Sequence, residues 1–227
     1  MLIEPNQILA HRGLWTEANE QNSFVALARA LDEGFGIETD VRDHNQDLVV
    51  SHDLPTGQSW PLVSLLEYYE SSRSSAWLAL NIKADGLADS LRELMALFSI
   101  GNYFVFDMSV PDMRHYDRLS IPFLTRQSEL EAEPALYDRA CGVWLDAFDG
   151  QWYSSAIIQG HLEAGKHVAV VSPELHRRPV EPTWNLLWNL VPSDRTDSST
   201  DRKMTPGRSE LLVCTDHPRE FRQRQGT

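Results

Sequence analysis

Two carboxylates between residues 36 and 53 have a spacing that suits metal binding. Glu38 and Asp40 lie two residues apart in an apolar, strand-like segment, so both side chains project from the same face of the strand. Paired carboxylate oxygens are donors that hard divalent cations prefer. The pattern therefore predicts a site for one divalent cation, Mg²⁺ or Ca²⁺, on this strand.

The segment that follows predicts a β-hairpin, because Asn45-Gln46-Asp47 separates two extended runs. If these three residues form the connection, Arg42 lies opposite Val50 and Asp40 lies opposite His52. Directly opposed residues have Cβ atoms about 5 Å apart. This register would place an imidazole beside the carboxylate pair, although a slip of one residue would remove it.

Short apolar runs alternate with amphipathic stretches along the whole chain. Helical spacing of apolar residues predicts helices near residues 24–31, 62–69, 87–97 and 152–162. Strand followed by helix, about eight times in about 220 residues, is typical of a (β/α)8 TIM barrel, although an open doubly wound sheet uses the same alternation. We therefore predict an α/β fold, a single barrel domain over residues 1–227 with a β-hairpin extension after strand 2. The predicted strands are Ile8–His11, Gly36–Arg42, Trp77–Lys83, Tyr103–Met108, Pro122–Arg126, Gly142–Phe148, His167–Ser172 and Leu211–Asp216.

Nearly every predicted strand ends in a charged or polar residue. A buried parallel strand should be apolar, and the carboxyl ends of barrel strands meet at one face, where barrel enzymes place their active sites. Strand ends also border polar loops, which explains any one of these residues taken alone. As a set they favour a site at that face: His11, Glu38, Asp40, Asn81, Lys83, Asp107, Arg126, Asp146, Ser172 and Asp216.

Composition narrows the class of protein. The chain has 227 residues, 33 acidic and 20 basic, and a net charge of −13; this argues against a nucleic-acid partner or an anionic membrane surface. No signal peptide and no stretch of about 18 apolar residues is present, so we expect a cytoplasmic protein without stable membrane insertion. The oligomeric state stays open. The polar, aperiodic segment from residue 193 to residue 210 predicts a mobile surface loop.

Six short motifs recur in an order that resembles the glycerophosphodiester phosphodiesterase family, from Ala10 to Pro218. Each motif is weak alone, but six in order are specific. The resemblance implies a TIM barrel, a single divalent metal and hydrolysis of glycerophosphodiesters by a histidine pair. The motifs are His11-Arg12-Gly13, Gln21-Asn22-Ser23, Glu38-x-Asp40, His52-Asp53, Asn81-Ile82-Lys83 and Thr215-Asp216-x-Pro218.

The resemblance also implies a role for each matching residue. His11 and His52 correspond to the general acid and base, a task that imidazole suits near neutral pH. Arg12 and Lys83 correspond to phosphate contacts, which would offset charge that builds on phosphorus. The metal ligands correspond to Glu38, Asp40 and Asn81.

The chain departs from the family in three places. Asn81 and Gln21 stand where the family usually has glutamate; the loss at Asn81 should weaken metal binding unless Asp85 or Asp107 supplies the charge. The loop after strand 7, residues 173–178, also differs. Because barrel specificity lies in such loops, we expect Glu174 and His176 to bind the leaving group and to favour a polar, sugar-like or phosphorylated alcohol.

These observations predict a metal-dependent hydrolase that cleaves a small-molecule glycerophosphodiester through a cyclic phosphate. The alternative is a non-catalytic barrel that binds a phosphorylated ligand, with Gln21 and Asn81 as signs of lost chemistry. A metal-dependent amidohydrolase is disfavoured, because no His-x-His follows the first strand to hold zinc.

Overall fold

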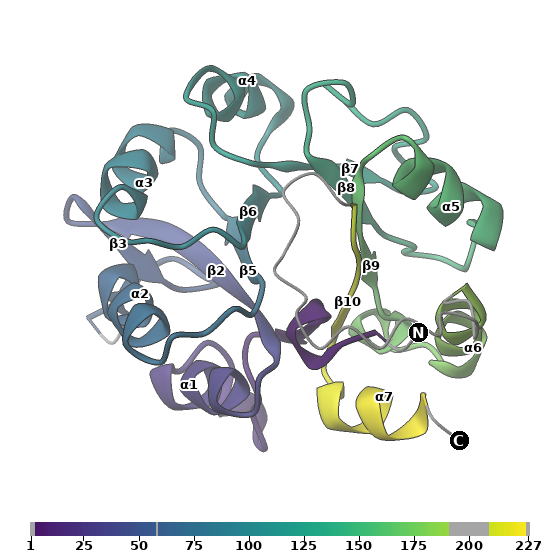
Figure 1. The fold of residues 1–227 in the computed structure, drawn as a ribbon. Coiled ribbons are helices and arrows are strands. Elements are labelled where there is room, and N and C mark those ends of the chain that lie inside the picture. The colour runs from purple at the N-terminus through teal and green to yellow at the C-terminus, as the bar shows by residue number, and fades with distance from the viewer. Residues whose placement is uncertain (1–2, 58, 191–208, 226–227) are drawn as a thin grey trace.

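The computed structural model describes residues 3–57, 59–190 and 209–225. Strands and helices alternate along them (Figure 1). The strands are β1 (Ile8–His11), β2 (Gly36–His44), β3 (Asp47–Val50), β4 (Trp60–Pro61), β5 (Leu78–Ile82), β6 (Tyr103–Phe106), β7 (Leu124–Gln127), β8 (Gly142–Leu145), β9 (His167–Val171) and β10 (Leu211–Thr215). The helices are α1 (Phe24–Asp32), α2 (Leu62–Ser71), α3 (Ala88–Met95), α4 (Val110–Arg118), α5 (Ser155–Glu163), α6 (Glu181–Leu190) and α7 (Pro218–Arg224), with 3-10 turns η1 (Pro5–Gln7), η2 (Ala18–Glu20) and η3 (Pro173–His176).

The parallel strands form a barrel surrounded by the helices (Figure 1). β1 pairs with β2 on one side and with β10 on the other; β2 continues to β5 and β6, and β10 continues to β9, β8 and β7. Within the described part of the chain, the bridge Val105–Phe123 joins the two arms between β6 and β7. The α/β barrel predicted from the sequence is confirmed, with a strand in each of the predicted segments.

Side chains alternate along each strand between two cores. One core lies inside the barrel and includes Leu9, Ala79, Phe104, Trp144 and Cys214. The other lies between the strands and the helices. Because residues two apart share a face, the polar residues that end the strands in phase with the interior core point into the barrel mouth. His11 follows Leu9 in this way, as Asp40 follows Glu38, Asn81 follows Ala79, Arg126 follows Leu124, Asp146 follows Trp144 and Asp216 follows Cys214.

The predicted hairpin after strand 2 is present, but its predicted register is wrong. Val41 pairs with Val50, and Arg42 pairs with Val49. The connection contains two residues, Asn45 and Gln46, both with positive φ (50° and 76°). Two-residue hairpin turns of this left-handed kind match the twist of the strands. Asp40 therefore does not lie opposite His52; its carbonyl accepts a hydrogen bond from the Ser51 amide at 3.1 Å.

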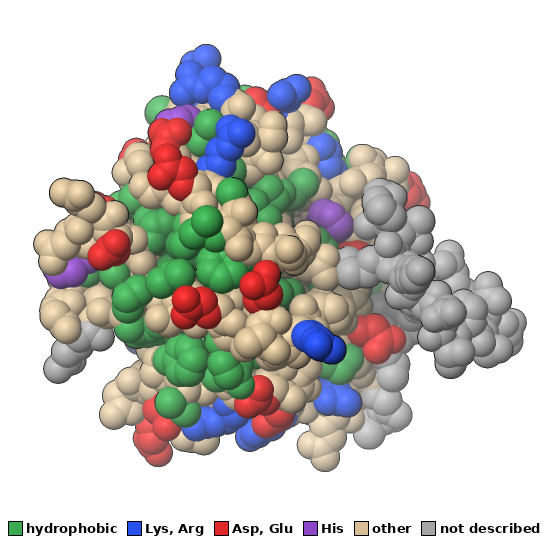
Figure 2. Space-filling model, turned by 60° about the vertical axis from the view of Figure 1, so that its left-hand side comes forward, with side chains coloured by type: hydrophobic (Ala, Val, Ile, Leu, Met, Phe, Trp, Pro, Cys, Tyr) green, Lys and Arg blue, Asp and Glu red, His purple; other side chains and the backbone are tan. Residues whose placement is uncertain are grey.

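The surface carries both apolar and charged side chains. Figure 2 shows apolar side chains gathered in the centre of one face, with carboxylates among them. The exposed large apolar residues include Val25, Leu54, Leu97 and Leu130. In the described part of the chain, no helix has both the length and the apolar character needed to cross a membrane. The segment predicted as a mobile loop lies outside the described residues, except for Ser209 and Glu210 at its end.

Candidate active site

His11 lies at the carboxyl end of β1 and is held by a carboxylate. Its Nδ1 lies 2.7 Å from Asp216 Oδ1, and its Nε2 lies 3.9 Å from Glu38 Oε2. Burial lowers the pKa of His11, but the hydrogen bond to Asp216 and the charges of Glu38 and Asp216 outweigh it, so the pKa is raised above its ordinary value. The arrangement orients the ring and favours its protonated form.

The residues after His11 turn the chain back over the barrel mouth. Arg12 and Gly13 both have positive φ (55° and 91°). A Cβ at residue 13 would lie 2.6 Å from the backbone carbon of Ala26, so glycine is required where this loop passes the start of α1. The turn directs the Arg12 backbone N–H to Glu38 Oε2 at 3.2 Å.

Arg12 and Lys83 converge on Asp40. The Arg12 Nε lies 3.0 Å from Asp40 Oδ2, and the Lys83 Nζ lies 3.2 Å from Oδ1. Asn22 donates a further hydrogen bond to Oδ2 at 2.7 Å. Gln21 accepts from the Arg12 guanidinium at 3.3 Å. The structure thus brings the predicted phosphate contacts and a predicted metal ligand together, with the two cations already paired to the carboxylate.

The second sequence motif, Gln21-Asn22-Ser23, forms the loop beside Arg12 and Asp40. Asn22 has a φ of 59°, and its Oδ1 accepts a hydrogen bond from the Thr39 hydroxyl at 2.8 Å, so one amide links β2 to the loop before α1. The Ser23 hydroxyl then accepts from the Ala26 amide at 3.2 Å and caps α1. These contacts fix the loop that carries Gln21 next to Arg12.

Glu38 is a buried carboxylate in an acidic setting. Glu38 is 1% exposed to solvent. Burial, and then repulsion from Asp40, raise its pKa to about 7. A carboxylate so disfavoured by its surroundings would gain from a cation placed beside it.

Asn81 is the third predicted metal ligand, and it lies beside Asp40 in the β2–β5 pairing. It is 7% exposed, and its Oδ1 is buried without a hydrogen-bond partner in the described residues. An unpartnered buried amide oxygen is costly unless something binds it. Across residues 3–57, 59–190 and 209–225, no three His, Cys, Asp or Glu side chains gather as a metal-binding group. The oxygen donors of Glu38, Asp40 and Asn81 nevertheless fit a hard cation.

The two carboxylates considered as substitutes for the missing charge are engaged elsewhere. Asp107 accepts a hydrogen bond from Arg126, and Asp85 accepts one from the Ser109 hydroxyl at 2.8 Å. Asp40, by contrast, pairs directly with Asn81 in the sheet, and Glu38 is on the same strand.

His52 lies on the wall of a cavity of about 480 Å³ that Arg12 also lines. Its side chain is 45% exposed, and its Nδ1 lies 2.9 Å from the carboxylate of Asp53, which is 94% exposed. Arg42 Nε donates to the His52 carbonyl at 3.0 Å. His52 and Arg12 line the same cavity, but the imidazole of His52 is more exposed than that of His11, and so is its carboxylate partner.

The loop after β9 contains the two residues predicted to bind the leaving group. His176 Nε2 lies 2.7 Å from Asp146 Oδ1, and its ring meets the edge of Phe148 at a centroid distance of 5.0 Å. Glu174 is bound instead by internal donors: the hydroxyls of Ser172 and Thr215, and the Asp216 backbone N–H at 3.0 Å. Its contact with a leaving group stays a prediction.

Asp216 is a site residue whose role the sequence did not predict, although it belongs to the motif Thr215-Asp216-x-Pro218. Its position at the end of the last strand, which neighbours the first strand in a closed barrel, is the signal that could have linked it to His11. That signal is usable only once β1 is known to pair with β10, in the register Ala10–Thr215.

The chain matches no protein-family model and no curated protein. Among solved structures it is similar to a glycerophosphodiester phosphodiesterase from Agrobacterium tumefaciens, with a TM-score of 0.59 and 18% identity over 95% of this chain and 99% of that one. It is also similar to a glycerophosphoryl diester phosphodiesterase from Parabacteroides distasonis, with a TM-score of 0.62 and 13% identity over 95% of this chain and 84% of that one. The chain thus has the fold of these two phosphodiesterases.

Proposed function

We propose that the protein hydrolyses a glycerophosphodiester-type small molecule with the help of one divalent cation. The observation that carries the proposal is the convergence at one barrel mouth of His11, held by Asp216 at 2.7 Å, with the pair of cations Arg12 and Lys83 around Asp40. An oriented imidazole beside cationic groups is what proton transfer at a phosphodiester requires. The names and the fold of the two similar phosphodiesterases support this class of reaction.

In the proposed reaction, a hydroxyl of the substrate's own glycerol attacks phosphorus. One of His11 and His52 takes the proton of that hydroxyl, and the other gives a proton to the departing alcohol. A cyclic phosphate results. Water then opens it, with the two histidines exchanging roles, so that each returns to its first protonation state.

The remaining residues bind and orient. Arg12 and Lys83 contact the phosphate oxygens, and His176, steadied by Asp146, contacts the leaving alcohol. Glu38, Asp40 and Asn81 would hold the cation, Mg²⁺ or Ca²⁺, which when bound would supply positive charge to offset that of the reacting phosphodiester. To bind the phosphate and the cation, the site would have to exchange the contacts that now join Asp40 to Arg12 and Lys83 for contacts with these two ligands.

A specific observation also favours the second candidate, a barrel that binds a phosphorylated ligand without cleaving it. Asp40 is neutralised by two cations, and Asn81 brings no charge to the donor set. Such a protein would keep Arg12 and Lys83 as anion contacts and lose turnover.

One experiment separates the two candidates. A panel of glycerophosphodiesters is incubated with the protein in Mg²⁺, in Ca²⁺ and in EDTA, and the products are followed by ³¹P NMR. Cation-dependent turnover with a transient cyclic phosphate is the expected result. Saturable binding of the same diesters without product in any of the three buffers would establish the binding protein instead.

A further inference from the structure

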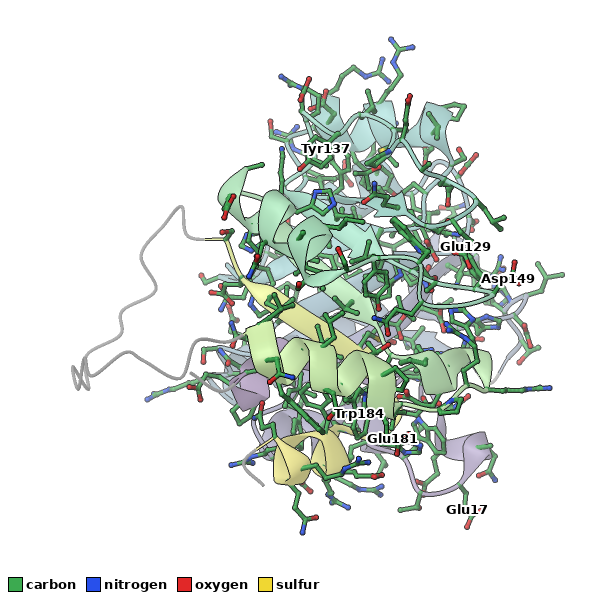
Figure 3. All side chains as sticks on the ribbon, turned by 90° about the vertical axis from the view of Figure 1, so that its right-hand side faces the viewer. Glu17, Glu129, Tyr137, Asp149, Glu181 and Trp184 are labelled. Atoms are coloured by element: carbon green, nitrogen blue, oxygen red, sulfur yellow. The ribbon has the colours of Figure 1, made fainter. Side chains whose placement is uncertain are left out.

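A buried chain of hydrogen bonds runs from α6 to the end of β10. The indole Nε1 of Trp184 donates to the Ser172 hydroxyl at 2.7 Å, and Ser172 is bonded to the Glu174 carboxylate. On the other side, the Thr215 hydroxyl accepts from the His217 backbone N–H at 3.0 Å and is bonded to Glu174. Trp184 belongs to α6, and on the side of that helix next to α7 (Figure 3) its ring meets that of Phe221.

Counting donors fixes the direction of these bonds. An indole N–H and a backbone N–H can only donate, so the Ser172 and Thr215 hydroxyls each accept there and turn their single hydrogen toward Glu174. The Asp216 backbone N–H donates to the same carboxylate at 3.0 Å. Glu174 therefore receives three hydrogen bonds, two on Oε1 and one on Oε2.

Glu174 extends the pairing of β9 with β10 beyond the ends of the two strands. The last backbone bond between them runs from the Ser172 N–H to the Cys214 carbonyl at 2.9 Å. The Asp216 N–H lies past that point, and the Glu174 side chain supplies its acceptor. A backbone N–H shielded from water needs such a partner, and this one is partly buried, so the conformation of Asp216 depends on a residue of the neighbouring loop.

We propose that Glu174 is a positioning residue that holds Asp216 in place and, through it, the ring of His11. The inference rests on the proposed function for its catalytic meaning. Glu174 fixes the backbone of Asp216, and the Asp216 carboxylate lies 2.7 Å from His11 Nδ1. Both Glu174 oxygens are bonded to these internal donors in the structure, which is the arrangement that the positioning role requires.

The test compares Glu174→Ala with Glu174→Gln. Alanine leaves the Asp216 N–H without an acceptor, so the carboxylate that orients His11 shifts. Glutamine keeps an oxygen for Thr215 and Asp216 and presents its NH₂ to Ser172, whose oxygen has a second lone pair. We expect kcat of Glu174→Ala to fall on the order of 10²-fold with KM nearly unchanged, because small misplacements of a reacting group cost this much. Glutamine should recover most of that loss.

Glu210 offers a matched control. Its carboxylate also accepts an indole hydrogen bond, from Trp77 Nε1 at 2.8 Å, and one from Gln7 at 3.1 Å. It precedes β10 and so lies at the opposite end of the barrel from Asp216. Glu210→Ala should lower the melting temperature as Glu174→Ala does, while leaving kcat unchanged. Equal losses of kcat in the two alanine variants would show that Glu174 matters only for stability.

A second readout does not depend on activity. A His ring N–H bonded to a carboxylate gives a downfield proton resonance in NMR. His52 and His176 also lie beside carboxylates, so the His11 resonance is the one that is absent from His11→Ala. The resonance should persist in Glu174→Gln and disappear in Glu174→Ala. If it persists unshifted in Glu174→Ala, the positioning role is wrong, even in a protein that proves to have no turnover. Should Glu174→Ala fail to fold, Thr215→Val removes one of the three donors, and an unchanged resonance and kcat there would likewise reject the role.

Discussion

The two histidines of the candidate site are held in opposite ways. His11 is 18% exposed in its side chain, and its partner Asp216 is equally shielded. His52 is 45% exposed, and its partner Asp53 is almost fully in solvent. Only the first pair lies at the end of a barrel strand. The comparison teaches that one side of the site is organised by the barrel strands themselves, whereas the other lies on an exposed loop after β3.

Replacing His11 should have the largest effect. We expect His11→Ala to lower turnover on the order of 10²–10⁴-fold, because an oriented acid or base contributes about this much. The melting temperature should change little, since the ring is at the mouth and outside the apolar cores. Initial rates on the best diester of the panel measure the loss. A rate within tenfold of the wild type would remove His11 from the mechanism.

Replacing His52 tests the loosely held side. His52→Ala should lower turnover on the order of 10²-fold, with an unchanged melting temperature because the side chain is 45% exposed. Asp53→Ala should cost much less, since an exposed carboxylate steadies the ring only weakly. If His52→Ala keeps the wild-type rate while His11→Ala loses it, a group other than His52 is the second proton carrier.

Adding a charge at position 81 should tighten cation binding. Asn81→Glu restores the carboxylate that the resemblance predicts, and we expect the dissociation constant for Ca²⁺ or Mg²⁺ to fall on the order of tenfold. Asn189→Glu on α6 adds the same charge away from the site and should change nothing. Isothermal titration measures both. No binding at millimolar cation, together with persisting hydrolysis, would reject the metal role.

Replacing His176 should change the preference among substrates more than the rate. We expect His176→Ala to alter the relative kcat/KM of the diesters several-fold while leaving a small chromogenic diester nearly unaffected. Arg177, exposed and in the same loop, provides the matched control as Arg177→Ala. An identical ranking of diesters in the wild type and in His176→Ala would leave this loop without a role in specificity.

The smallest effect concerns pH and Glu38. Its pKa rises from 4.5 to about 7 on folding, so the folded chain binds this proton more tightly than the unfolded chain. The contribution of Glu38 to stability therefore declines as pH rises from about 4.5 to about 7. Melting temperatures of the wild type and Glu38→Gln in EDTA should converge at the acid end and diverge toward neutral pH. Parallel curves would show that Glu38 is not strained by its burial.

Much of the fold could be predicted from the sequence, because apolar periodicity reports burial directly. Each predicted strand is present, and β1 has its predicted bounds. The helices α4, α6 and α7 were not predicted. α4 begins with a Ser109 cap and is mostly polar, with only Met113 and Tyr116 buried, so its apolar stripe is too narrow to recognise.

The site was predictable where residues adjoin in sequence and not where tertiary structure joins them. The Glu38–Asp40 pair follows from strand geometry alone. The hairpin register could not be predicted in this way, because Gln46 adopts a φ of 76°, which residues other than glycine and asparagine rarely do. The pairing of His11 with Asp216 needed barrel closure between residues 205 apart. The hydrogen bonds of Glu174 to Thr215 and Asp216 could be predicted only once β10 was known to lie beside β9.

The ring of strands is joined at one place more by side chains than by backbone. Between β6 and β7, among the described residues, Val105–Phe123 is the bridge that completes the barrel, while inside it Phe106 stacks on Trp144 of β8 at a centroid distance of 3.8 Å. A barrel built in this way has a preferred line of opening. Amide hydrogens along that line should exchange with solvent through local separations that leave β1, β2 and β10 paired. Slow exchange would then mark the half of the barrel that carries His11, and faster exchange the half that carries Arg126.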